Sequence, residues 1–438
     1  MFGKRRIRIV WLVNDRYVNN FITVYRESKK SFDFDIKVVA VPRLGYEFSP
    51  FISSEEIFEY LSREGIDCVN CYDKDKGDFI DIESFNADYI FTTTPYDIYL
   101  PEEYRSDKII YCAKLCNILY GAIMTPLIEE SDYMKNAYMI FTSGKKSVHE
   151  NNKCIDIGCM KIDEYLHYGR KKLRKNNKFQ VAWKPRWTLN ENESNLVAYI
   201  DNFYKWSIQH SDVELLFISH PMLKENAKHI GWKEYYKYMD LYEKTDNISI
   251  VEDGNFMDDV MAADVFIGDM CTTMIEFATT GKPIIYTEGH GFENELTKEV
   301  INNSYVARNF QEIISILSDL KFGKDPIKKK REDAAKSYFT VPPKKMSSAK
   351  YLLSILKKDF KEHPFIKMKR IRIGDEVIVN GYGSCSAWGE KDNTLKMESV
   401  HMKVLDIRED GINKYGCAII GNSDITCWVG KEDVIYHK

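Results

Sequence analysis

The sequence has no apolar run long enough to cross a membrane. Its longest uncharged stretch runs from Leu115 to Ile128, whereas a spanning helix needs about 20 apolar residues. The first apolar stretch, Ile9–Val13, is too short for a secretion signal and is soon followed by Asp15. We therefore expect a cytoplasmic protein whose membrane contact, if any, is peripheral and at the inner face of the cell membrane.

Neither sign of charge predominates. The chain has 62 Lys and Arg against 66 Asp and Glu, which gives a net charge of −4. Nucleic-acid-binding domains are usually strongly basic, so the composition argues against a nucleic-acid partner. Basic clusters occur locally at Arg170–Lys175 and Lys328–Arg331. We interpret them as solvated surface, with contact to anionic lipid as the alternative.

A recognisable disulfide or metal framework is also missing. Cys68 and Cys71 form one close pair and Cys112 and Cys116 another, but the gap of about forty residues between the pairs fits no standard zinc spacing. The ten cysteines are therefore expected to be reduced thiols. We predict no metal site and no cofactor.

What the sequence does contain is two series of short apolar runs that alternate with helical stretches. Its 438 residues suggest about three folding units. Apolar runs of this kind predict parallel strands covered on both faces, so the fold class is α/β with two doubly wound, Rossmann-type domains. We assign an N-terminal acceptor domain to residues 1–165, a linker to 166–178 and a nucleotide-donor domain to 179–345. Ligands of such sheets bind beyond the carboxyl ends of the strands, so both domains should face one cleft.

The expected strands of the first domain are 7–13, 35–41, 89–94, 108–112 and 138–142. Those of the second domain are 179–183, 213–219, 248–251, 265–268 and 283–286.

Residues 346–438 have a different sequence pattern from the two α/β domains. Residues 346–364 contain a basic amphipathic helix, Ser347–Phe360, which we expect to close back across the two domains; a helix lying on a membrane surface is the alternative. Residues 365–438 hold short β-rich runs separated by glycines and predict a small all-β barrel that looks like the Src-homology type. Tyr382, Trp388 and Trp428 are candidates for binding a protein or glycan partner, unless they pack in the core.

The most informative stretch follows the expected strand Val265–Gly268. Small and polar residues come next, before a helix that stops at Gly281: Asp269, Cys271, Thr272 and Thr273. Unpaired N–H groups of a helix start, together with threonine hydroxyls, suit a diphosphate. Glu276 lies one turn beyond Thr272, within reach of a ribose hydroxyl. A capped helix without a ligand is the alternative.

His220 ends another expected strand, between Ser219 and Pro221, at the rim of the cleft. A positively polarised imidazole there would serve as a general acid or as an electrostatic clamp for a leaving phosphate. A purely structural histidine is the alternative.

The order of these features resembles the CDP-glycerol glycerophosphotransferases of teichoic-acid and capsule assembly. The family's P-T-W-R after a strand is echoed in Val181–Trp187, which keeps Pro185 and Trp187, and its S/K-H-P is matched by Ser219–Pro221. The remaining matches follow in family order: Phe256–Asp264, Gly268–Glu276, Lys282–Pro283, and in the first domain Gly158–Leu166 and Pro95–Asp97.

The resemblance implies a GT-B fold and transfer of a glycerol phosphate or other polyol phosphate from a CDP-polyol to a lipid-linked or glycan acceptor, with release of CMP. It also implies a set of donor-binding residues, of which His220 is catalytic as well: Pro185, Arg186, His220, Asp269, Cys271, Thr272, Thr273 and Glu276.

One departure concerns the general base. Family polymerases carry a W-H-G whose histidine is taken as the base that activates the acceptor hydroxyl, but the corresponding stretch Leu115–Gly121 has no histidine. Asp15, in the loop after the first strand, is the geometric substitute, with a helix N-cap as the alternative role. His149 and His167 are weaker candidates.

Two other functions remain open. A GT-B glycosyltransferase that uses a nucleotide-sugar needs the same phosphate cradle, so the sequence does not separate it from a polyol-phosphate transferase. A non-catalytic adaptor would use the C-terminal barrel, and the missing histidine favours it.

Overall fold

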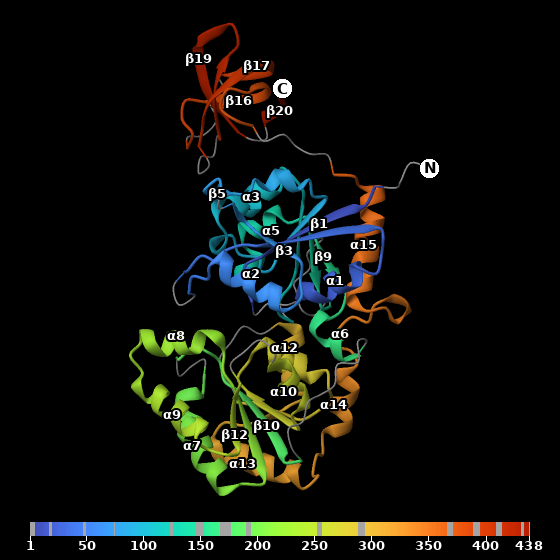
Figure 1. Cartoon of the computed structure of the whole chain (residues 1–438), viewed down its shortest axis with the longest axis vertical. Coiled ribbons are helices and arrows are strands. Elements are labelled where there is room, and N and C mark those ends of the chain that lie inside the picture. Colours follow the sequence, from blue (N-terminus) through green and yellow to red (C-terminus); the bar gives the residue numbers. More distant parts are fainter. Residues whose placement is uncertain are drawn as a thin grey trace. The chain divides into compact units, whose positions relative to one another are not determined.

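The computed structural model describes residues 5–16, 20–46, 50–73, 75–122, 126–144, 153–166, 177–189, 194–251, 256–287, 294–365, 371–388, 395–408, 414–430 and 433–437. It divides into two compact units, Met1–Phe365 and Ile366–Lys438. The first contains both α/β domains and the second contains the barrel (Figure 1). His149, His167, the cluster Arg170–Lys175 and most of the expected linker lie outside the described residues.

The first sheet has seven parallel strands in the order β3-β2-β1-β6-β7-β8-β9. The strands are β1 (Ile7–Val13), β2 (Phe34–Ala40), β3 (Cys68–Asn70), β6 (Tyr89–Thr92), β7 (Lys114–Ile118), β8 (Met139–Thr142) and β9 (Cys154–Asp156). The accompanying elements are α1 (Asn20–Ser28), α2 (Ser54–Arg63), the hairpin β4 (Tyr72–Asp73) and β5 (Asp78–Phe79), α3 (Ser106–Ile109), α4 (Pro126–Glu129), α5 (Asp132–Asn136) and α6 (Met160–Leu166).

Both faces of this sheet are covered. Ile9 and Trp11 of β1 enter one core cluster, whereas Val10 and Leu12 enter another. The two-residue alternation of a strand therefore carries apolar side chains into both layers of helices, as a continuous apolar run predicts.

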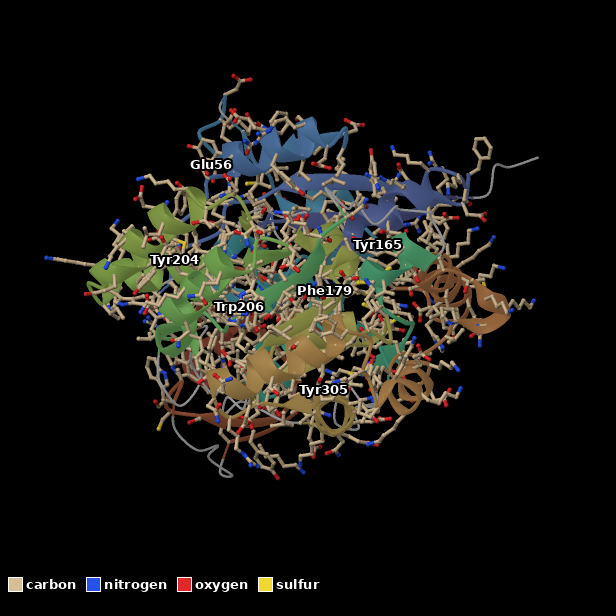
Figure 2. The ribbon with its side chains drawn as sticks, turned by 90° about the horizontal axis from the view of Figure 1, so that it is seen from below. Glu56, Tyr165, Phe179, Tyr204, Trp206 and Tyr305 are labelled. Atoms are coloured by element: carbon tan, nitrogen blue, oxygen red, sulfur yellow. The ribbon has the colours of Figure 1, made fainter. Side chains whose placement is uncertain are left out.

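The second sheet has six parallel strands in the order β12-β11-β10-β13-β14-β15. The strands are β10 (Phe179–Lys184), β11 (Val213–Ile218), β12 (Ile248–Val251), β13 (Val265–Gly268), β14 (Ile284–Tyr286) and β15 (Tyr305–Val306). Its helices are α7 (Leu196–Gln209), α8 (Pro221–His229), α9 (Lys233–Glu243), α10 (Phe256–Ala262), α11 (Thr272–Ala278), α12 (Glu295–Asn302), α13 (Phe310–Lys321) and α14 (Lys328–Ala335). Figure 2 shows Phe179 at the start of β10 and Trp206 on α7. The predicted doubly wound α/β class is confirmed.

One predicted strand is wrong. Residues 108–112 do not enter the sheet: they include the end of helix α3 and the turn after it. Asp97 accepts hydrogen bonds from the backbone N–H and the hydroxyl of Ser106, the former at 2.7 Å, and so fixes the start of this helix. The place beside β6 is taken by β7, which begins at Lys114. Because this apolar run is too short to show a periodicity, the sequence does not distinguish a strand from a helix here.

Helix α15 (Ser348–Glu362) returns from the second domain to the first and lies beside α1 (Figure 1). Ala349, Leu352, Leu353 and Leu356 are buried in the core that also holds Trp11. Because its apolar face is covered, the alternative of a helix lying on a membrane is wrong. Within the described part of the chain, no helix has both the length and the apolar character needed to cross a bilayer.

The second unit is a closed barrel. Strands β16 (Glu376–Ser384), β17 (Lys396–Ile407), β18 (Tyr415–Ile419) and β19 (Asn422–Val429) pair in a ring, and β20 (Val434–His437) adds to β16. The prediction of a small all-β barrel is confirmed. Trp388 is 55% exposed, whereas Trp428 packs over Gly416 of the neighbouring strand.

Candidate active site in the interdomain cleft

The polar residues predicted for the site follow strands at the two switch points of the sheets. In the first sheet β1 pairs with β2 on one side and β6 on the other, and in the second sheet β10 pairs with β11 and β13. Strand order reverses at such a central strand, so the loops beyond it diverge and leave a crevice. Asp15 follows β1, Arg186 follows β10 and Asp269 follows β13.

The loops from the two domains meet at Gly121 and Thr272. A Cβ atom at Gly121 would lie 2.7 Å from Thr272 Cγ2, so only glycine permits this approach. Deeper in the interface, Cys159 and Ile162 of the first domain share a small core with Met257 and Met261 of α10. The cleft is therefore closed at its base by packed side chains.

His220 is the N-cap of α8, and its ring stacks on Trp187 with centroids 6.0 Å apart. Its Nδ1 accepts a hydrogen bond from Met222 N at 3.1 Å, so the proton of the neutral ring is on Nε2. Burial lowers the pKa of His220 to about 3, and nearby Lys184 and Arg186 contribute. The ring is therefore neutral at pH 7 with Nε2–H as a hydrogen-bond donor, and its role as a general acid or clamp stays a prediction.

Asp269 is buried in a hydrogen-bond cluster of its own domain. It accepts from Arg186 N and Asn195 N, both at 3.2 Å, and from Thr287 Oγ1 at 2.6 Å. Burial raises the pKa of Asp269, while these hydrogen bonds oppose the rise. The carboxylate therefore joins the loop after buried Pro185 to the ends of β13 and β14. This arrangement suits positioning of Arg186 better than direct contact with a donor.

Helix α11 carries the other predicted donor residues, and its N-cap is Cys271, whose side chain makes no cap hydrogen bond. Thr273 is buried and Thr272 is half-buried. The helix has only seven residues, so its aligned dipole is short. Side chains must therefore supply most of the positive charge that a diphosphate requires.

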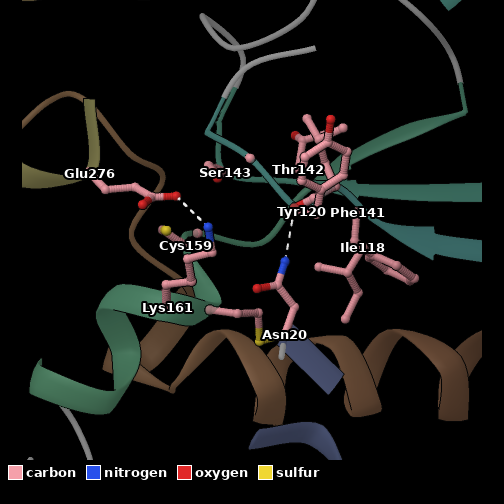
Figure 3. Close-up of a pocket in the computed structure, with 13 residues that line it drawn as sticks. Asn20, Ile118, Tyr120, Phe141, Thr142, Ser143, Cys159, Lys161 and Glu276 are labelled. Atoms are coloured by element: carbon pink, nitrogen blue, oxygen red, sulfur yellow. Dashed lines mark hydrogen bonds and ion pairs between the residues drawn. The ribbon is translucent and has the colours of Figure 1, made fainter. Parts of the chain in front are cut away.

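Glu276 makes an ion pair across the cleft. Its Oε1 lies 2.9 Å from Nζ of Lys161 on α6, and both side chains line a small pocket that is partly open to solvent (Figure 3). Burial lowers the pKa of Lys161, but the Glu276 carboxylate raises it, and the overall shift is upward. Glu276 is 1% exposed, and its Oε2 has no hydrogen-bond partner within the described part of the chain. A buried acceptor of this kind is suited to a hydroxyl-bearing ligand.

A second contact fixes the two domains close by. Tyr165 of α6, labelled in Figure 2, donates a hydrogen bond of 2.6 Å to Asp258 of α10. Sequence reasoning did not find Lys161 or Tyr165, because the partner of each lies in the other domain.

Asp15, the predicted base, is buried and ion-paired with Arg43, which lies over the ring of Tyr99 at 4.4 Å. The guanidinium of Arg43 is bonded to one carboxylate oxygen of Asp15, Oδ2. In the stretch without histidine, Tyr120 lines the pocket, with its hydroxyl 3.1 Å from that of Tyr96. Burial raises the pKa of Tyr120, so its hydroxyl stays protonated.

The described residues contain no group of three or more His, Cys, Asp or Glu side chains arranged to hold a metal ion. The basic cluster Lys328–Arg331 forms the start of α14, and its interpretation as solvated surface is wrong for Arg331. That side chain is buried, bonded to Asp325 at 2.5 Å and to Gly281 O at 2.9 Å.

Two Rossmann-type domains with one cleft, and a final helix that returns to the first domain, define a GT-B transferase fold. The sequence profile of the family described as CDP-Glycerol:Poly(glycerophosphate) glycerophosphotransferase matches residues 127–351, just over half of the chain. The protein belongs to this family. No curated protein gives a match to the sequence.

Solved structures agree on the fold. The wall teichoic acid polymerase TagF aligns with a TM-score of 0.55 at 11% identity, over 82% of this chain and 90% of TagF. The S. aureus MnaA–UDP complex gives 0.52 at 12% identity, over 82% and 97%. A putative UDP-N-acetylglucosamine 2-epimerase from Listeria monocytogenes gives 0.51 at 13%, over 84% and 100%.

Proposed function

We propose that the chain transfers a polyol phosphate, such as glycerol phosphate, from a CDP-linked polyol to a hydroxyl group of a lipid-linked or glycan acceptor and releases CMP. The observation that carries the proposal is the family match, which includes both sides of the cleft: α6 with Lys161, and the donor side from β10 to α11. The polymerase TagF, a wall teichoic acid enzyme by name, has the same fold.

The donor side of the cleft offers groups for the diphosphate and the ribose of a CDP-polyol. The neutral His220 donates from Nε2 to a phosphate oxygen, and Thr272 donates from its hydroxyl. Glu276 accepts from a ribose hydroxyl through its unpaired Oε2. Asp269 acts indirectly, by holding the backbone of Arg186.

On the acceptor side, Asp15 is the proposed base. Its carboxylate, held beside Arg43, would accept the proton of the attacking hydroxyl. The proposal includes contact with the inner membrane face, because a lipid-linked acceptor must be reached from the membrane surface. It also includes a protein or glycan partner of the barrel.

The test is release of CMP. Purified full-length protein should produce CMP from CDP-glycerol or CDP-ribitol in the presence of a panel of hydroxyl-bearing acceptors, and the Asp269→Ala variant should lose most of this activity. Absence of CMP from every CDP-polyol across the panel would contradict the proposal. Intact biological activity in the cell with both the Asp269→Ala and the His220→Ala variants would instead favour an adaptor.

A nucleotide-sugar transferase is the second candidate, because it needs the same phosphate cradle and because the MnaA–UDP complex has the same fold. The two reactions leave different products, because a sugar transferase releases the whole nucleoside diphosphate. Chromatography of the reaction with UDP- and GDP-sugars therefore separates the two candidates.

A further inference from the structure

Lys184 is the last residue of β10 and lies beside Gly268 of β13 at the switch point of the second sheet. It is 5% exposed. Its Nζ lies over the ring of Phe256, 5.2 Å from the centroid. Within the described residues, no carboxylate or other acceptor is bonded to this ammonium group.

Two other lysines, the buried Lys114 and the half-buried Lys161, have anionic partners. Lys114 is bound to Asp359 at 2.6 Å, and Lys161 to Glu276 at 2.9 Å. A buried charge is costly unless it is paired, and a ring face compensates only part of that cost. Lys184 therefore has capacity for an anion that the protein itself does not supply.

The residues around Lys184 indicate that an anion bound by it would lie on the donor side of the cleft. Burial lowers the pKa of Lys184, whereas Cys271 and Glu276 are close enough to raise it. On the other side, Lys184 is near enough to His220 to help lower the pKa of that imidazole. The ammonium thus lies between the two halves of the predicted donor site, in a region where water is scarce and electrostatic attraction is strong.

We propose that Lys184 binds the diphosphate of the nucleotide donor and stabilises the phosphate that leaves with the nucleoside. The inference rests on the proposed function and adds a residue to its machinery. The acceptor oxygen bonds to the phosphorus of the polyol phosphate while the bond from that phosphorus to the bridging oxygen breaks. The bridging oxygen keeps the electron pair and leaves on CMP, and the acceptor's proton passes to Asp15. The negative charge on the departing phosphate grows during this step, beside the ammonium.

The test uses full-length protein and three probes: CDP, UDP and inorganic diphosphate. The Lys184→Met variant keeps the length of the side chain and removes its charge. Calorimetric titration should show CDP binding about 10- to 100-fold weaker, the range for loss of a charged hydrogen bond. Lys184→Arg should recover part of the affinity. The control is Lys205→Met, which removes an exposed lysine paired with Asp201 on α7 and should bind as the wild type does.

Thermal unfolding without ligand separates this role from a structural one. Lys184→Met removes a buried charge with no anionic partner, so it should melt at the same temperature as the wild type or higher. Wild-type affinity in Lys184→Met would overturn the inference. The inference would also be overturned if Lys184→Met melted at a lower temperature than the wild type and Lys184→Arg recovered none of the lost affinity.

Failure of the proposed function has a different signature. Wild-type protein that binds UDP but not CDP, with the binding lost in Lys184→Met, would support Lys184 and contradict a CDP-polyol donor. Wild-type protein that binds none of the three probes would overturn the role of Lys184, and the CMP assay would then decide on the proposed function by itself.

Discussion

At the scale of single residues, the protein controls charge in its cleft by deciding which side chains have partners. Glu276 and Lys161 neutralise each other across the domains, and Asp15 does the same with Arg43. Lys184 has no bonded anion among the residues that the structure describes, and its charge helps to keep His220 neutral. A sequence motif names the residue types but does not reveal these pairings, which is why the neutral state of His220 was not predicted.

The neutral histidine predicts a specific pH dependence. The pKa of His220 falls from its ordinary 6.5 to about 3 in the folded protein. Below pH 6.5 the unfolded chain binds a proton that the folded chain does not, so stability is lost as the pH falls. Between pH 7 and pH 5 the wild type should lose about 1–2 kcal/mol that His220→Gln does not lose.

Urea unfolding of both proteins at the two pH values measures this difference. Parallel behaviour of wild type and variant would mean that His220 has an ordinary pKa and is charged at pH 5.

At the scale of secondary-structure elements, strands and helices with clear apolar patterns were predictable. Strands β12 and β13 have the bounds expected from sequence, because each apolar run ends at a polar or glycine residue. The error at residues 108–112 arises from a hydrogen bond between Asp97 and Ser106 that no local pattern reveals. Contacts between elements distant in sequence, such as Lys161 with Glu276, were likewise out of reach.

Helix α15 offers a test at this scale. Asp359 accepts hydrogen bonds from Tyr89 at 2.6 Å and Tyr138 at 2.7 Å and is ion-paired with Lys114. The Asp359→Ala variant leaves a buried ammonium without its anion, so unfolding of the first domain should become easier by about 3–5 kcal/mol.

The matched control is Lys357→Ala on the same helix, which removes a half-exposed pair with Asp33 and should cost less than about 1 kcal/mol. Equal effects of the two variants in denaturant unfolding would show that the helix is held by its apolar face alone.

At the scale of the whole molecule, the family and the GT-B fold were predictable because they depend on the order of many loose motifs rather than on any one of them. The donor residues were predicted on three separate loops of the second domain, and the structure places those loops around the same switch point. The acceptor side was less predictable: its candidate base, Asp15, depends on the partner Arg43 from another loop. The barrel folds around a core of its own, which includes Val377, Val404 and Val429.

A crystal structure of the full-length protein with CDP tests the central claim most directly. We expect the diphosphate against Lys184, with His220 and Thr272 as further donors and the ribose hydroxyls at Glu276. CDP bound away from the switch point of the second sheet, or a cleft that stays without nucleotide at saturating CDP, would contradict the account.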